Sequence, residues 1–262
     1  MCLNKESGQS VQVFVISLRE STERRTRIKN QLNQRGIEFQ FFDAIDSHSH
    51  MGALRKFENA QKTRKIKGYR LKPAELACFA SHRQLWEKCI EKNKPIVIIE
   101  DNVDLHDFHP KDLFNISEQT RDFSYIKLSA TRKRVFLKIK KLCNKYYLGQ
   151  YVSNTCGTTA YIISPIAAKA FFDSSQQFIE PVDDYMEKIW KHGVKAYSIS
   201  PSLFSRAKIR STIGSGSRRK VKENIRIMSR FYIELYRVFE FLLRIFCFLD
   251  WFRIIKLKYR KS

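Results

Sequence analysis

Four oxygen-bearing side chains directly after a short apolar run are the residues of this sequence best suited to chemistry. They are Glu100, Asp101, Asn102 and Asp104, and they follow the run Pro95–Ile99. Hard divalent cations prefer clustered oxygen ligands, often shared with a phosphate group of the substrate. We therefore predict a metal–phosphate site here. A solvated acidic turn is the alternative, because acidic residues are common in turns.

A second pair of carboxylates, Asp183 and Asp184, lies in the segment Pro181–Tyr185 at the predicted start of a helix. Acidic side chains at a helix start can cap the helix and interact favourably with its dipole. A carboxylate can equally serve as a general base that takes a proton from an acceptor hydroxyl. Adjacent acids usually point apart, so one of the two can cap while the other catalyses.

Cationic and imidazole side chains near the same strands are further candidates. His82 lies in a predicted helix, where a structural role competes with donation to phosphate or sugar oxygens. Arg19, Arg24 and Arg25 follow the first predicted strand and are placed to grip phosphates. Simple solvation is the alternative for these arginines.

The elements that position these residues begin with a strand–helix–strand unit. Val11–Ile16 is a predicted strand, Glu20–Gln34 a helix with Ser21 or Thr22 as its N-cap and Gly36 after its end, and Ile37–Phe42 a second strand. A right-handed unit of this kind implies a parallel sheet. The run Pro95–Ile99 is typical of a strand buried on both faces of such a sheet, and ligands bind outside the carboxyl ends of these strands.

Alternating helices and strands continue to about residue 200. We predict helices at 72–93, 165–172 and 181–192, strands at 123–128, 157–163 and 194–199, and a basic hairpin at 132–147. The basic stretch after Gly52 shows little periodicity and is predicted to be a mobile loop. The pattern indicates an α/β fold with a mostly parallel sheet.

The charge of the chain predicts an anionic partner. The 262 residues carry a net charge of +23. Residues 206–262 hold sixteen Lys/Arg and four Asp/Glu, and residues 55–72 hold a second basic group. Nucleic acid, a membrane surface and a phosphorylated substrate are the candidates. Nucleic acid is disfavoured, because the sequence has no RNP-like motif, no helix-turn-helix pattern and no basic stripe interleaved with stacking aromatics.

The cysteines and the N-terminus favour the cytoplasm. The six cysteines form no CxxC pair and no zinc-like spacing with histidine, which fits reduced thiols better than a disulfide framework. Residues 1–10 are polar and do not resemble a signal peptide.

The last part of the chain differs from the rest. A flexible basic linker is predicted at 213–220 and an aromatic and aliphatic helix at 225–255, where charges fall mostly along one stripe. These charges are too frequent for a transmembrane helix. A basic amphipathic helix of this kind suits the bilayer interface and its anionic lipids. Docking on the catalytic domain or on a partner subunit is the alternative. We predict a catalytic domain at 1–205 and a linker with a membrane-associating tail at 206–262.

Taken in order, six segments resemble glycosyltransferase family 25, the enzymes of bacterial lipooligosaccharide synthesis that are related to collagen galactosyltransferases. The resemblance spans about residues 11–201. The matching segments are Val15–Leu18 with Glu23–Arg25, Phe42–Asp46, Leu71–Glu75 with Cys78 and Ser81–His82, Ile99–Asn102, Gly157–Tyr161 and Pro181–Asp184.

The resemblance implies a GT-A-like fold, a UDP-sugar donor that is commonly UDP-galactose, assistance by Mn²⁺ or Mg²⁺, and inversion at the anomeric carbon. By position, it places Asp101 and Asn102 at the metal and the diphosphate. It also places the following residues at the donor: Ser17, Arg19, Arg24, His82 and Glu100. Asp183 or Asp184 would be the base.

Two positions depart from the family pattern. Asn102 replaces a usual Asp, and Ser17 replaces a common Asn. The loss of one negative charge at Asn102 should weaken metal affinity or shift the ligand role to Asp101 or Asp104.

The resulting hypothesis is a cytoplasmic enzyme at the inner face of the membrane that transfers a hexose to a lipooligosaccharide acceptor. A nucleic-acid-binding protein and an inactive glycan-binding relative are the alternatives.

Overall fold

The computed structural model describes residues 11–130, 134–142, 145–153, 155, 157–209 and 227–259, with backbone alone from residue 250. The predicted linker at 213–220 and the polar residues 1–10 lie outside the described residues.

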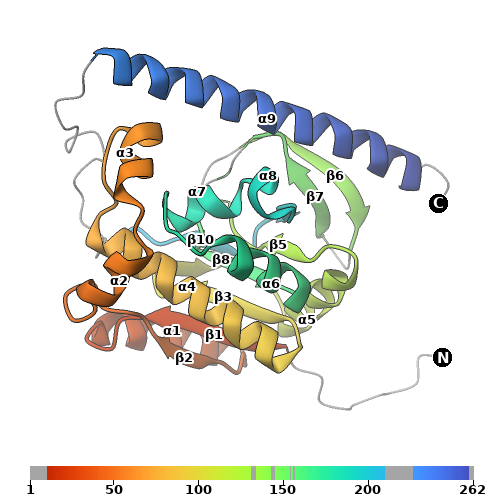
Figure 1. The fold of residues 1–262 in the computed structure, drawn as a ribbon. Helices are drawn as coiled ribbons and strands as arrows, with labels where there is room; N and C mark the ends of the chain where they lie inside the picture. Colours follow the sequence, from red (N-terminus) through yellow and green to blue (C-terminus); the bar gives the residue numbers. More distant parts are fainter. Residues whose placement is uncertain are drawn as a thin grey trace.

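A twisted eight-stranded sheet forms the centre of the molecule (Figure 1). The strand order is β2-β1-β3-β8-β5-β9-β7-β6. Their bounds are β1 Gln12–Ser17, β2 Gln40–Asp43, β3 Ile96–Glu100, β5 Tyr125–Lys127, β6 Phe136–Lys141, β7 Tyr147–Tyr151, β8 Ala160–Ile163 and β9 Tyr197–Ser200. The pairings make β7 and β8 antiparallel to the other six strands. The fold is therefore mixed α/β with a large, mostly parallel central sheet.

Helices cover both faces of this sheet. One core cluster packs α4, α6 and α7 on one face, and a second packs α1 and α5 on the other. The helices are α1 Thr22–Gln34, α2 Met51–Phe57, α3 Ala60–Lys67, α4 Pro73–Lys92, α5 Pro110–Glu118, α6 Pro165–Ser174, α7 Val182–Met186, α8 Ile189–His192 and α9 Ile227–Tyr259, with a 3-10 turn at Gln119–Arg121.

The predicted strand–helix–strand unit and the buried strand before the acidic residues are confirmed. β1 pairs in parallel with both β2 and β3, and the apolar residues of β3 from Ile96 to Ile99 are fully buried. Gly36 closes α1 with a φ of 65°, a conformation that costs glycine little. The basic hairpin is confirmed as β6 and β7.

The basic stretch after Gly52 is not a mobile loop, so that prediction is wrong. It forms α2 and α3, whose Leu54 and Ile66 are buried against the main core. The Asn59 side chain accepts a hydrogen bond from the first turn of α3, and Gly68 ends the helix with a φ of 76°. A few buried side chains and two good caps suffice to order short helices whose sequence lacks strong periodicity.

The predicted helix at 181–192 is also wrong in one respect, because it is two short helices. α7 ends at Met186, and α8 begins after Lys188, whose backbone is outside the helical region at φ −104° and ψ 76°. The side chain of Lys188 is buried in ion pairs described below, and these fix the break.

The acidic segment continues into a small second sheet that was not predicted. β4 (Val103–Leu105) pairs antiparallel with β10 (Phe204–Arg206). This sheet carries the chain of residue 104 away from the end of β3.

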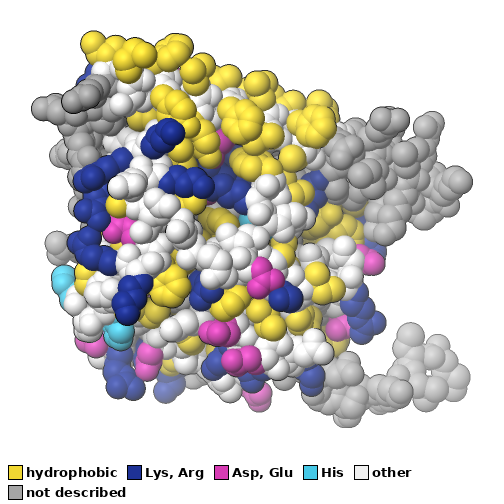
Figure 2. Space-filling view, viewed as in Figure 1, with side chains coloured by type: hydrophobic (Ala, Val, Ile, Leu, Met, Phe, Trp, Pro, Cys, Tyr) yellow, Lys and Arg dark blue, Asp and Glu magenta, His cyan; other side chains and the backbone are white. Residues whose placement is uncertain are grey.

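α9 confirms the helix that was predicted in the last part of the chain, and it packs on α3 and α8 across the top of the domain in Figure 1. The apolar side of α9 faces away from the domain, which is unusual for a helix that packs on one. Ile233 and Glu240 face the domain, whereas the positions on the opposite side are apolar and exposed. We call these residues the outer face of α9: Phe231, Leu235, Val238, Phe239, Leu242, Ile245, Phe246 and Leu249. Figure 2 shows them within a hydrophobic band along the top of the molecule.

Candidate active site

A cleft lies at the carboxyl ends of β1 and β3, bordered by the start of α4. It contains six residues that the sequence predicted for a site, drawn from three distant segments. They are Ser17, Arg24, His82, Glu100, Asp101 and Asn102. We call it the central cleft. Its position is the usual one for ligands in open α/β sheets.

The alternation of side chains along β3 explains how adjacent acids reach different partners. Ile96, Ile98 and Glu100 point to the α4 side of the sheet, where Glu100 meets His82. Val97, Ile99 and then Asp101 point to the α1 side, where Asp101 meets Arg24. The strand therefore delivers one carboxylate to each wall of the central cleft.

His82 is held by a buried hydrogen-bonded chain. The Tyr161 hydroxyl lies 3.1 Å from Nε1 of Trp86 and 2.8 Å from Nδ1 of His82. Because an indole nitrogen only donates, the hydroxyl accepts from Trp86, and His82 Nδ1 is its second partner. The other ring nitrogen, Nε2, faces the Glu100 carboxylate at 3.7 Å.

Glu100 is kept ionised at the floor of the cleft. Burial by itself would raise its pKa, but the facing His82 ring and hydrogen bonds from Thr158 (2.5 Å) and Asn102 (3.1 Å) hold the pKa below its ordinary value. Glu100 is thus an oriented, negatively charged group whose oxygens already have partners.

Asp101 is held on the other wall. Its carboxylate accepts a hydrogen bond from the Ser17 hydroxyl at 2.7 Å and pairs with Arg24 at 3.3 Å. Burial raises the pKa of Asp101, and the neighbouring Glu100 adds to this, while Ser17 and Arg24 act in the opposite direction. A carboxylate in this setting gains from a further positive charge.

The residues present fit a divalent cation next to Asp101. The Asn102 side-chain oxygen is buried and has no hydrogen-bond partner among the described residues, although its nitrogen donates to Glu100. An amide oxygen beside a carboxylate is a suitable pair of hard ligands.

A different set of possible ligands, Cys78, His82 and Glu100, also lies close together. Burial and the nearby carboxylates raise the pKa of the Cys78 thiol well above its ordinary value, so the sulfur is a neutral thiol and a poor ligand.

Four predicted site residues do not line the central cleft. Asp104, on β4, forms an ion pair with Arg27 of α1, and the exposed Arg19 pairs with Asp43 at 3.3 Å. The other two are Asp183 and Asp184, on α7.

The two adjacent acids of α7 have different partners. Asp184 pairs with Lys67 at 3.7 Å, and burial raises its pKa while Lys67 acts against the rise. Asp183 accepts the backbone N–H of Asp184 at 3.0 Å, and its charge contributes to the raised pKa of both Cys78 and Tyr125. Asp183 is therefore within electrostatic reach of Cys78, which lines the central cleft, and Asp184 faces an ion-pair cluster.

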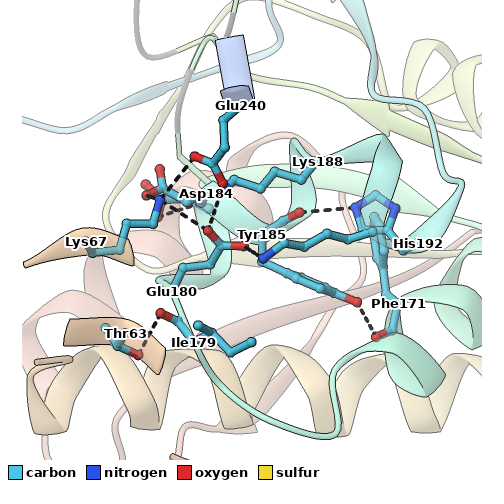
Figure 3. A network of polar contacts seen from close by, with 12 residues as sticks. Thr63, Lys67, Phe171, Ile179, Glu180, Asp184, Tyr185, Lys188, His192 and Glu240 are labelled. Carbon is cyan, nitrogen blue, oxygen red and sulfur yellow. Dashed lines mark hydrogen bonds and ion pairs between the residues drawn. The ribbon is translucent and has the colours of Figure 1, made fainter. Parts of the chain in front are cut away.

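This cluster joins α3, the α7–α8 region and α9 (Figure 3). It contains three cations and three carboxylates linked by ion pairs: Lys67, Lys188, Lys191, Glu180, Asp184 and Glu240. Burial alone would raise the pKa of Glu180, but the three lysines lower it to about 2. We call these six residues the ion cluster.

A second hollow lies beneath α9, beside the strand ends of β5 and β7. Aromatic and cationic side chains line it, including Tyr151, Trp190 and Arg244. At one side, Lys127 pairs with Glu187 at 2.5 Å. Arg244 contributes the cationic side chain of α9 to this lining.

Sequence reasoning gave no role to Tyr161, Thr158, Lys67, Lys188 or Glu240. Tyr161 and Thr158 lie in a segment that the resemblance included, but nothing in a linear pattern shows which carboxylate or imidazole they contact. The three charged residues lie on separate elements, and only long-range packing brings them together.

The fold and the site together define an α/β protein with a cleft at the carboxyl ends of its parallel strands. The family model described as Glycosyltransferase family 25 (LPS biosynthesis protein) matches residues 10–186. The chain belongs to this family.

Proteins of similar sequence support this family assignment. The lacto-N-neotetraose biosynthesis glycosyltransferase LgtE of Neisseria gonorrhoeae is 31% identical over 211 residues, 74% of this chain and 73% of that protein. The lipooligosaccharide biosynthesis protein lic2B of Haemophilus influenzae is 33% identical over 165 residues, 60% of each chain. Human procollagen galactosyltransferase 2 is 25% identical over 218 residues, 73% of this chain and 34% of that protein.

Membership in a glycosyltransferase family implies a sugar donor and a glycan acceptor. Within the described part of the chain, no helix has the length and apolar character needed to cross a bilayer.

Proposed function

We propose that this protein transfers a hexose from a UDP-sugar to a lipooligosaccharide acceptor, and that galactose is the preferred hexose. The observation that carries the proposal is the convergence of predicted donor residues from three distant segments on one cleft at the strand ends, in a chain of this family. The names of the relatives LgtE and lic2B support an acceptor of the lipooligosaccharide type.

Arg24 and His82 are suited to the diphosphate of the donor, since both border the central cleft and offer N–H groups. Asp101 and Asn102 would hold Mn²⁺ or Mg²⁺. A bound cation would neutralise charge on the leaving diphosphate. Glu100, fixed by Thr158, is placed to orient a hydroxyl of the sugar or the ribose.

Asp183 is our choice for the base. Its charge acts on Cys78, which lines the central cleft, whereas Asp184 is engaged by Lys67. In the reaction, the acceptor oxygen bonds to the anomeric carbon as the bond from that carbon to the diphosphate breaks. The hydroxyl proton goes to Asp183, and UDP leaves with the bonding electrons. Direct displacement of this kind inverts the anomeric carbon.

We place the acceptor glycan in the hollow beneath α9. Sugar rings stack on aromatic side chains such as Trp190, and Arg244 offers a charge to an anionic substituent. The hollow adjoins α7, because Glu187 follows that helix directly.

The outer face of α9 supports a membrane surface as the partner. A helix that docks on a protein normally buries its apolar side, whereas Phe246 is 70% exposed and Ile233 is 5% exposed. Lys and Arg side chains gather beneath the hydrophobic band, over α2 and α3 (Figure 2). An apolar stripe next to basic residues fits an anionic bilayer, and we propose peripheral binding at the inner face of the cytoplasmic membrane.

The decisive experiment measures UDP release and product formation with a panel of UDP-sugars, truncated lipooligosaccharide acceptors and Mn²⁺. Loss of a general base costs about 10²–10⁴ in kcat, so Asp183→Asn should lose that much. Asp184→Asn serves as the neighbouring comparison and should lose far less. No turnover of any UDP-sugar by the wild type would refute the proposal in favour of an inactive glycan-binding relative.

A vesicle assay tests the membrane surface separately. Phe239→Gln together with Phe246→Gln should release the protein from vesicles of anionic phospholipid, while Ile166→Gln, an equally exposed position on α6, should leave binding unchanged. Unchanged binding of the double variant, or a dimer in solution that buries this face, would contradict the assignment.

A further inference from the structure

The ion cluster reaches electrical balance only through α9. Two of its three carboxylates, Glu180 and Asp184, lie in α7 or next to it. The third carboxylate is Glu240 of α9, so three carboxylates face the three lysines only when α9 is docked. Lys67 Nζ lies 3.2 Å from Glu180, 3.7 Å from Asp184 and 3.6 Å from Glu240, so a single ammonium group joins α3, α7 and α9 (Figure 3).

The ion cluster is buried, so an uncompensated charge within it would be costly. The side chains of Glu180 and Lys188 are 1% and 3% exposed, and Glu240 is 14% exposed. Removing one partner from a buried ion pair leaves a charge without compensation, and the structure must then shift or admit water. Without the Glu240 carboxylate, three cations would face two carboxylates.

α7 is the element that depends on this cluster. It is only five residues long and is bracketed by Glu180 and Lys188, two members of the cluster, while Asp184 lies within it. A helix of one turn has little stability of its own. Asp183 is adjacent to Asp184 in the same short helix, so a shift of α7 also moves its carboxylate, whose charge acts on Cys78 of the central cleft.

We propose that Glu240 is a positioning residue: by completing the ion cluster, the docked α9 fixes α7 and thereby sets the place of Asp183 relative to the central cleft. The catalytic part of this inference rests on the proposed function, whereas the ordering of α7 by α9 does not. Because the opposite side of α9 is the face proposed for lipid, engagement of the membrane and placement of the base act through the same helix.

Hydrogen exchange tests the ordering of α7 independently of catalysis. In the full-length protein, Glu240→Gln keeps the shape of the side chain and removes its charge. We expect amide exchange in Val182–Met186 to rise about tenfold, equivalent to about 1.4 kcal/mol of local stability, with exchange in α1 unchanged. Glu234→Gln is the matched control, since Glu234 lies on the same helix, is exposed and, among the described residues, forms an ion pair with Arg237 alone.

A charge-balanced double variant separates positioning from simple loss of a contact. Lys67→Met with Glu240→Gln leaves two lysines facing two carboxylates and should return α7 exchange towards the wild-type rate. If the double variant is as perturbed as Glu240→Gln, or if Glu240→Gln exchanges like Glu234→Gln, the proposal is wrong. Circular dichroism and the thermal midpoint establish that each variant is folded, and Glu240→Asp replaces Glu240→Gln if the latter does not fold.

Kinetics tests the consequence for transfer. We expect Glu240→Gln to lower kcat about tenfold while the KM for the donor stays within about twofold, because the donor residues lie on other elements. A changed donor KM with unchanged kcat would overturn the positioning of Asp183. If the wild type turns over no donor, the proposed function fails, and hydrogen exchange still decides whether Glu240 orders α7.

Discussion

The Tyr161 hydroxyl offers a quantitative test of how the central cleft is built. It accepts a hydrogen bond from Trp86 Nε1 at 3.1 Å and shares one with His82 Nδ1 at 2.8 Å, and all three side chains are completely buried. Tyr161→Phe keeps the ring and leaves both nitrogens without this partner. An unsatisfied buried polar group costs about 1–3 kcal/mol, so two such groups should lower the free energy of unfolding by about 2–6 kcal/mol.

Urea titration followed by circular dichroism measures this loss, and the thermal midpoint gives a second readout. For a chain of this size, each 1 kcal/mol shifts the midpoint by about 2–4 °C, so a fall of at least about 4 °C is expected. Tyr232→Phe is the control, because that ring lies 40% exposed on α9 and its replacement should change stability by less than about 0.5 kcal/mol.

A double-mutant cycle with Trp86→Phe identifies the cause. Residues in one buried hydrogen-bonded chain couple by about 0.5–3 kcal/mol. A loss for Tyr161→Phe that is no larger than for Tyr232→Phe would refute the hydrogen-bonding scheme. Strictly additive effects with Trp86→Phe would refute the shared hydroxyl.

Three further predictions concern the cleft, the acceptor hollow and pH. Asp101→Asn should abolish transfer and weaken Mn²⁺ binding measured by calorimetry. Asp104 pairs outside the cleft, so Asp104→Asn should keep both transfer and Mn²⁺ binding. Equal losses in the two variants would contradict the ligand assignment. Trp190→Ala should raise the acceptor KM about tenfold with the donor KM unchanged, and the outer-face variant Phe246→Ala should alter neither KM in detergent solution. Burial lowers the pKa of His192 from 6.5 to about 4, so the unfolded chain binds the additional proton between these values. Stability should therefore fall as the pH drops from 6.5 to 4, by up to about 3 kcal/mol, and His192→Gln should flatten the urea midpoint across that range; an unchanged slope would show that another group is responsible.

Local patterns predicted the elements that carry the central cleft. The β-branched run before Glu100 has to be a buried strand, and the helix caps and glycines fixed α1 and α4 to within a few residues. The strand–helix–strand pattern likewise predicted that β1 and β2 are parallel. These features depend on residues near one another in the chain, so they can be read from the sequence. The pairing of β1 with β3, which brings Ser17 to Asp101, was not predicted and is a finding of the structure.

Short elements and the break between α7 and α8 escaped prediction for a physical reason. α2 and α3 contribute few buried side chains, and their order comes from caps and from contacts with distant segments. Asp104 looked equivalent to Asp101 in the sequence, but pairing of β4 with β10 turns its segment towards α1, where Arg27 takes its carboxylate.

The sequence by itself determined the family, the sheet, the helix in the last part of the chain and the chemical groups that gather at the strand ends. Only the tertiary structure decided which partners Asp184 contacts, that Tyr161 links His82 to Trp86, and that α9 turns its apolar side outward while Glu240 enters the ion cluster. Composition and periodicity record which residues are apolar or charged. Side-chain direction and charge balance depend on partners that are distant in the chain, and those partners meet only in the folded molecule.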